Sequence, residues 1–203
     1  MKIICVGLNY GEHIREMGGS PPSEPLFFLK ADSSLLKGGK PLFLPSFSDS
    51  VEYEAELVYR ICRVGKSIPA RFAYRYYDAV TVGIDVTARD IQKRQMERGL
   101  PWEISKSFDF AAPIGDFIPT EELCETGGIG FRLEKNGVVV QRGSSAEMIF
   151  GVDSLISYLS QFFTLKIGDM IFTGTPSGVG PMRCNDHFTG YIGERKVLDL
   201  HIR

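Results

Sequence analysis

Apolar residues along this chain gather in short runs separated by glycine and proline, a pattern typical of β-strands. The Asn136-Gly137 pair between two of these runs predicts a tight hairpin turn. The predicted strands cover residues 2–7, 26–30, 51–61, 80–86, 131–134, 137–141, 169–173 and 196–202.

Helical periodicity is confined to a few segments. The segment after Thr87 carries Asp90 three residues later and ends at Gly99, which resembles a capping box closed by a C-terminal glycine. The predicted helices cover residues 70–78, 88–98 and 152–163. Strands and helices do not alternate regularly, so a parallel doubly wound sheet is disfavoured. We therefore expect a mixed, β-rich α+β fold, a β-roll with a few packed helices.

The composition is that of a soluble globular protein. Hydrophobic residues make up 43% and charged residues 24% of the 203 positions, with a formal net charge of -2. This balance gives no reason to expect a nucleic acid or a membrane as partner. The four cysteines are widely spaced and form no CxxC pair, which argues against a zinc site or a disulfide framework: Cys5, Cys62, Cys124 and Cys184. We expect one cytoplasmic domain over residues 1–203.

The segment 51–58 carries the most informative pattern. Side chains on a strand alternate between its two faces, so Glu52, Glu54 and Glu56 point one way and the residues between them point the other. One interpretation is a solvated acidic face. Another is a divalent cation, which would relieve the repulsion of like charges on one face. Carboxylate oxygens suit Mg²⁺, Mn²⁺ or Ca²⁺ better than zinc or copper.

A second polar group follows an apolar strand. Asp85 ends this strand and precedes a predicted helix, so it is either a helix cap or a further carboxylate of the same site. Arg89 and Gln92 lie three residues apart and share one face of that helix. They either hold substrate oxygens near Asp85 or are solvated.

Several motifs match one known family, in order and over nearly the whole chain. They are residues 6–10 with His13 and Glu16, 28–30, 54–57, 85–92, 99–102, 106–109, 168–169 and 173–181. On these residues the chain resembles the short members of the fumarylacetoacetate hydrolase family, close to the acylpyruvase type. The resemblance implies a β-roll around a metal ion, of the sandwich or barrel kind, usually found as a homodimer.

The resemblance also implies roles for individual residues. The metal, Mg²⁺ or Mn²⁺, is expected on Glu54, Glu56 and Asp85. Substrate contacts are expected from Lys30, Arg89, Gln92 and Thr175. The catalytic residues are expected to be Lys106 and a dyad of His13 and Glu16, on a lid helix within residues 9–20.

This residue set suits chemistry on a small 2-oxo acid. A divalent ion polarises the 2-oxo group and stabilises an enolate. C–C hydrolysis of acylpyruvates, decarboxylation of oxaloacetate and isomerisation of 2-hydroxyhepta-2,4-diene-1,7-dioate or oxaloacetate all follow from that enolate. A histidine oriented by a carboxylate is a good general base, so His13 and Glu16 favour hydrolysis. A tautomerase, or a catalytically silent metal- or metabolite-binding protein, stays an alternative.

Two other features predict no chemistry. The glycine-rich loop at residues 174–180 lacks the Gly-Lys-Ser/Thr ending of a phosphate-binding loop. His187 and His201 have no partner at a recognisable spacing, so we expect them to be structural or exposed.

Overall fold

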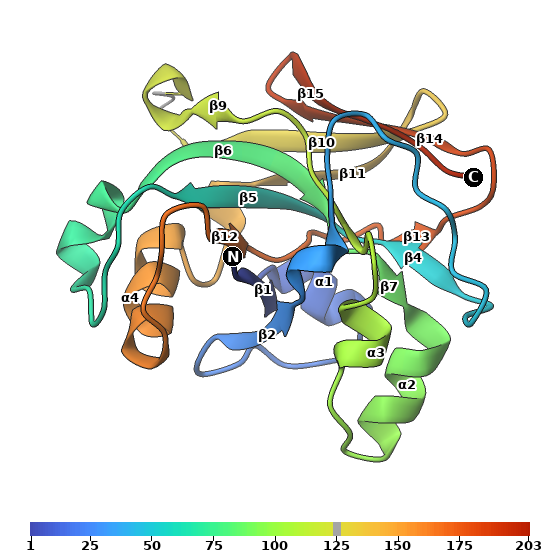
Figure 1. Ribbon diagram of the computed structural model, residues 1–203, viewed down its shortest axis with the longest axis horizontal. Coiled ribbons are helices and arrows are strands. Elements are labelled where there is room, and N and C mark those ends of the chain that lie inside the picture. Colours follow the sequence, from blue (N-terminus) through green and yellow to red (C-terminus); the bar gives the residue numbers. More distant parts are fainter. Residues whose placement is uncertain (124–126) are drawn as a thin grey trace.

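The computed structural model describes residues 1–123 and 127–203. Its elements form a six-stranded and a four-stranded sheet, with two small sheets beside them. Figure 1 shows the four-stranded sheet lying over β5 (Ala55–Ile61) and β6 (Tyr77–Ile84). Helix α4 (Val152–Phe162) lies below one end of this pair, and α2 (Arg89–Glu97) and α3 (Glu103–Lys106) lie below the other (Figure 1).

The large sheet joins segments from both ends of the chain. Its strand order is β2-β1-β12-β5-β6-β9. Strand β12 (Met170–Phe172) pairs in parallel with β1 (Ile3–Gly7) and antiparallel with β5. The remaining strands of this sheet are β2 (Leu26–Lys30) and β9 (Ile118–Pro119).

The four-stranded sheet has the order β11-β10-β14-β15. Its strands are β10 (Gly130–Lys135), β11 (Val138–Ser144), β14 (His187–Ile192) and β15 (Arg195–His201). The predicted hairpin at Asn136 and Gly137 joins β10 and β11, and both residues have the positive φ that a tight turn requires. The small sheets are β13-β4-β7 and β3-β8. They consist of β3 (Leu35–Leu36), β4 (Val51–Tyr53), β7 (Thr87–Ala88), β8 (Ala112–Pro113) and β13 (Gly180–Pro181).

Strand β5 separates the main core from the polar site by its alternation. Ala55, Leu57 and Tyr59 belong to the main hydrophobic core, together with residues of β6, β10, β14 and β15. Glu56 and Val58 point to the opposite face. The predicted strand 51–61 is interrupted at Glu54. The backbone N–H of Ala55 there donates to the side chain of Gln141 at 2.8 Å rather than to a neighbouring strand.

The helices differ in detail from those predicted. Helix α4 is confirmed and packs Leu155, Ile156 and Leu159 into a second core cluster. The predicted helix 70–78 is a short 3₁₀-helix, Ala70–Arg75. The capping box at α2 was wrong: Ala88 is the N-cap and no side chain caps this helix, because Thr87 pairs as part of β7. In the part of the chain that the structure describes, three further 3₁₀ turns cover Asp32–Ser34, Thr120–Leu123 and Ser145–Glu147.

The fold class is confirmed: strands dominate, helices are few, and the sheets of the described residues form no closed barrel. Cys5, Cys62 and Cys184 are free thiols, and Cys124 lies outside the described residues. In residues 1–123 and 127–203, no helix is long and apolar enough to cross a membrane.

Candidate active site

A cavity opens where α1 (Gly11–Glu16), α2 and α3 approach the β1, β5 and β6 strands. Eight of the ten residues predicted for the site line it. These eight are His13, Glu54, Glu56, Asp85, Arg89, Gln92, Lys106 and Thr175. Glu16 and Lys30 do not line the cavity, but Glu16 contacts His13 and Lys30 contacts Asp85, which do.

Three buried carboxylates lie at one end of the β5–β6 pair. Glu54 occupies the break before β5, Glu56 lies on β5, and Asp85 directly follows β6. The antiparallel register places Asp85 beside Glu54, whose carbonyl accepts the Asp85 N–H at 2.8 Å. One carboxylate oxygen of each residue lies within 4.8 Å of the others. Asp85 is therefore not a helix cap but part of the same cluster as the two glutamates.

Lys106 and Arg89 compensate most of this negative charge. The Lys106 ammonium lies 2.8 Å from both Glu54 Oε2 and Asp85 Oδ2 and donates to Thr87 Oγ1 at 2.6 Å. Arg89 pairs with Glu54 at 2.5 Å and with Glu52 at 2.6 Å. Although burial opposes it, the cations of Lys106 and Arg89 hold the pKa of Glu54 well below its usual range.

Lys30 lies behind the cluster and is fully buried. Its ammonium is 2.7 Å from Asp85 Oδ1 and 3.4 Å from the carbonyl oxygen of Val86. It also donates to the carbonyl of Lys106. These contacts place Lys30 against the outer side of Asp85, away from the cavity, so its position is suited to orienting a carboxylate rather than touching a substrate.

Glu56 is the uncompensated member of the cluster. Its Oε2 accepts the N–H of Gly174 at 2.7 Å, and no cation in the described residues forms an ion pair with it. Burial, followed by the charges of Asp85 and Glu54, raises the pKa of Glu56 well above its usual value. Three convergent carboxylates, one of them without a cation, are a hard oxygen donor set that fits a divalent ion such as Mg²⁺ or Mn²⁺.

The short helix α1 brings a histidine over this cluster. His13 is buried and lines the cavity, and its Nδ1 lies 3.4 Å from Glu16 Oε2. The same Glu16 oxygen accepts the N–H of Gly178 at 3.3 Å. Glu16 therefore connects His13 to the glycine-rich loop. A neutral His13 that donates from Nδ1 keeps Nε2 available as a base.

Sequence reasoning missed one residue that holds the site together. Gln141 on β11 is buried, and its amide donates to Thr175 Oγ1 at 2.8 Å while its oxygen accepts the N–H of Ala55. It thus joins the carboxylate strand to the loop that carries Thr175. Nothing in the local pattern marks Gln141, because its partners lie more than 30 residues away in either direction.

Gly174, which precedes Thr175 in the loop, has a left-handed backbone conformation that residues with a side chain rarely adopt. Its φ is +95°, and a Cβ at this position would lie 2.8 Å from the Cβ of Asn9. This close approach allows the Gly174 N–H to reach Glu56. Asn9 in turn donates to the Thr173 carbonyl at 2.8 Å, which holds the segment before α1 against the same loop.

The outer wall of the cavity is apolar. It is formed by Met17, Leu26, Phe28, Met96 and Trp102. Phe28 and Trp102 pack with their ring centroids 5.7 Å apart. The cationic side chains among the described lining residues are those of Arg89 and Lys106, and both lie beside Glu54, at the carboxylate end of the cavity rather than in this wall. The wall therefore offers apolar contact and no further cation to a ligand.

Comparison with known proteins gives consistent results. A family model described as fumarylacetoacetate (FAA) hydrolase C-terminal matches residues 2–203. A mitochondrial oxaloacetate tautomerase of Mus musculus is 38% identical over 190 residues, which cover 94% of this chain and 86% of that protein. A mitochondrial oxaloacetate decarboxylase of Dictyostelium discoideum is 41% identical over 183 residues, covering 90% and 84%. The crystal structure of fumarylpyruvate hydrolase from Pseudomonas aeruginosa, in complex with Mn²⁺ and pyruvate, has a TM-score of 0.93 and 37% identity, covering 100% and 89%.

Proposed function

The chain belongs to the fumarylacetoacetate hydrolase family and is an enzyme of that family, and on this premise we propose that it hydrolyses a C–C bond in small 2,4-dioxo acids, the acylpyruvates, with Mg²⁺ or Mn²⁺ as cofactor. The observation that favours acylpyruvates as substrates is the apolar outer wall of the cavity. An acylpyruvate ends in an acyl tail without charge, whereas oxaloacetate ends in a second carboxylate. A second carboxylate placed against the wall would lose its hydration without gaining a partner.

The charge of the site supports the same choice. Four carboxylates and three cations meet there, so the cluster has a formal excess of one negative charge. A divalent cation changes the formal charge of the cluster from -1 to +1. A monoanionic 2-oxo acid then neutralises the site, whereas a dianionic acid leaves it with an excess of one negative charge. The groups counted are Glu52, Glu54, Glu56 and Asp85 against Lys30, Arg89 and Lys106.

We assign the metal to Glu54, Glu56 and Asp85, and it supplies Lewis acidity toward the 2-oxo group when bound. Arg89 and Gln92 lie on the cavity side of α2 and bind the substrate carboxylate. Thr175, held by Gln141, orients the same end of the molecule from the loop. Lys106 stabilises negative charge as it develops on the substrate oxygen, and Lys30 positions Asp85 from behind.

His13 and Glu16 provide the hydrolytic step. His13 Nε2 takes a proton from water, which adds to the acyl carbonyl carbon. The bond between that carbon and the methylene then breaks, giving a carboxylic acid and pyruvate enolate. The enolate receives the proton back from His13 and leaves as pyruvate. Glu16 stabilises the imidazolium that exists between the two transfers, from 3.4 Å.

We propose that residues 1–203 act as one catalytic unit, with the segment 9–20 as a lid over the cavity. Helix α1 lies within this segment, and its contact with Gly178 holds the lid closed. The homodimer and the cytoplasmic location stay predictions; analytical ultracentrifugation and cell fractionation test them.

Oxaloacetate chemistry is the second candidate, because two relatives are named for tautomerisation and decarboxylation of that acid. The test compares kcat/KM for acetylpyruvate, butyrylpyruvate and oxaloacetate, in Mg²⁺ and in EDTA. We expect metal-dependent release of pyruvate from both acylpyruvates, with a higher kcat/KM than for oxaloacetate. Turnover of oxaloacetate alone would refute acylpyruvate hydrolysis and assign the site to decarboxylation or tautomerisation.

A further inference from the structure

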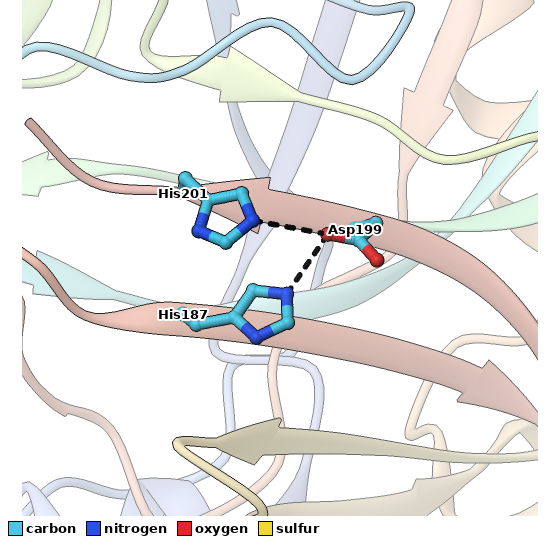
Figure 2. Close-up of side chains that lie close together, drawn as sticks. All are labelled: His187, Asp199 and His201. Carbon is cyan, nitrogen blue, oxygen red and sulfur yellow. Dashed lines mark hydrogen bonds and ion pairs between the residues drawn. The ribbon is translucent and has the colours of Figure 1, made fainter.

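A second group of metal-ligating side chains lies outside the cavity, on the four-stranded sheet. His187 begins β14, and Asp199 and His201 lie near the end of β15. Asp199 and His201 are two residues apart and so share one face of the strand. The register pairs His187 directly with His201, which brings all three side chains to the same face. Figure 2 shows both imidazole rings beside the Asp199 carboxylate.

The three side chains converge on one point. Asp199 Oδ1 lies 2.8 Å from His187 Nε2 and 3.8 Å from His201 Nε2 (Figure 2). The two rings are stacked, with centroids 4.2 Å apart and planes only 6° from parallel. The second oxygen of Asp199 is held by Lys196 at 2.8 Å. The other oxygen of the carboxylate, Oδ1, faces both histidines.

The backbone beneath these side chains is held on both strands. Asn136 binds the His187 backbone twice, because its side chain accepts the His187 N–H at 2.9 Å and its own N–H donates to the His187 carbonyl. The carbonyl of His201 accepts the N–H of Leu42 at 2.9 Å. The three ligands are therefore partly exposed side chains on a fixed backbone, which needs only side-chain rotation to close around an ion.

We propose that His187, Asp199 and His201 form a binding site for a divalent transition ion of the Zn²⁺ class, separate from the carboxylate site. Two imidazole nitrogens and one carboxylate oxygen are the ligands that zinc takes in open three-ligand sites. The ligand atoms lie within 4.8 Å of one another. On binding, each neutral imidazole carries its proton on Nδ1, and the Nε2 lone pair and Asp199 Oδ1 coordinate the ion.

The two sites differ in the ions they prefer. The cavity presents three carboxylates and no imidazole in its acidic cluster, which favours Mg²⁺ or Mn²⁺. The surface site has two imidazoles, which favour Zn²⁺, Ni²⁺ or Cu²⁺. An ion there ties the start of β14 to the end of β15. The consequence is a stabilisation of the C-terminal strand that does not require the active site.

Nuclear magnetic resonance of the histidine rings tests this proposal directly, because the chain has three histidines and the third, His13, serves as an internal control. Zn²⁺ is titrated into the full chain in saturating Mg²⁺. We expect the ring signals of His187 and His201 to move together and to saturate at one equivalent, while the His13 signal stays in place. Independent midpoints for the two rings, or no saturable change, would overturn the proposal.

Matched variants separate this site from other ligands. His187→Ala is expected to weaken Zn²⁺ binding at His201 by at least the ~10- to 100-fold that loss of a supporting group costs a metal site. Lys196→Met keeps all three ligands and should bind at least as tightly as the wild type. Cys184→Ser, which removes an exposed thiol, should bind unchanged. An unchanged His201 response in His187→Ala, or loss of binding in either control, would contradict the assignment.

Discussion

Lys106→Met removes one of the cations that compensate the buried carboxylates while preserving most of the side-chain volume. Lys106 is 3% exposed, and its ammonium lies 2.8 Å from both Glu54 and Asp85. Breaking a buried ion pair by removing one partner typically lowers the free energy of unfolding by about 3–5 kcal/mol. We expect a loss of this size in EDTA, measured by urea denaturation followed by circular dichroism.

Magnesium should reverse much of this loss. The variant cluster is more negative than that of the wild type and binds a divalent ion more tightly. Each tenfold gain in affinity raises the stabilisation by saturating metal by about 1.4 kcal/mol. The gain in unfolding free energy on adding Mg²⁺ is therefore expected to be larger for Lys106→Met than for the wild type.

Lys196→Met is the matched control for this experiment. Its ammonium also lies 2.8 Å from a carboxylate, that of Asp199, but both side chains are well exposed. Solvent and salt screen such a pair, so the substitution should leave the unfolding free energy nearly unchanged in EDTA and in Mg²⁺. The reasoning would be refuted if both variants lost equally little stability, or if Mg²⁺ stabilised Lys106→Met no more than the wild type.

Three further substitutions address the cavity and the strands beneath it. Glu56→Gln should weaken Mn²⁺ binding at least ~10-fold, measured by calorimetry. The metal-free variant should be no less stable than the wild type, because the substitution removes a buried carboxylate that no cation compensates; a lower stability in EDTA would contradict this. His13→Ala should lower kcat on acetylpyruvate by about 10²–10⁴ with Mn²⁺ affinity unchanged, and equal kcat would exclude His13 as the base. Gly83→Ala should lower the free energy of unfolding, measured by urea denaturation, by about 1–3 kcal/mol, because a Cβ at this position would lie 2.7 Å from Val58 Cγ2. An unchanged free energy of unfolding would show that β5 and β6 separate easily.

Local patterns predicted the strands that lie in the large core, because burial on one face imposes a regular alternation on them. Strand β5 shows this alternation clearly, with Leu57 inside and Glu56 on the opposite face. Two-residue strands such as β7 were not predicted. These short strands form because a backbone segment pairs with a segment far away in the sequence, as Glu52 does with Thr87. The local sequence contains no signal for such a pairing.

The site was predicted in part for a similar reason. Glu54 and Glu56 lie two residues apart in one predicted strand, so the sequence places them on one face. Asp85 was identified because it ends another predicted apolar strand. The contacts of Lys30 and Gln141 depend on the packing of separate elements, so the sequence alone did not indicate that Lys30 supports Asp85 from behind. His187 and His201 are 14 positions apart, and only the β14–β15 register brings them together.

The place of β12 in the large sheet has a consequence for synthesis. Residues 170–172 are made late, yet they lie between β1, which leads into His13, and β5, which carries Glu56. Until residues 170–172 are made, the β1–β2 and β5–β6 pairs are two antiparallel strand pairs that do not adjoin in the large sheet. A nascent chain therefore lacks the strand that joins these two pairs into one sheet, and closing contacts over so long a stretch of chain is slow. The newly made protein is expected to become active only after β12 has inserted between β1 and β5, with a lag equal to the time of that insertion.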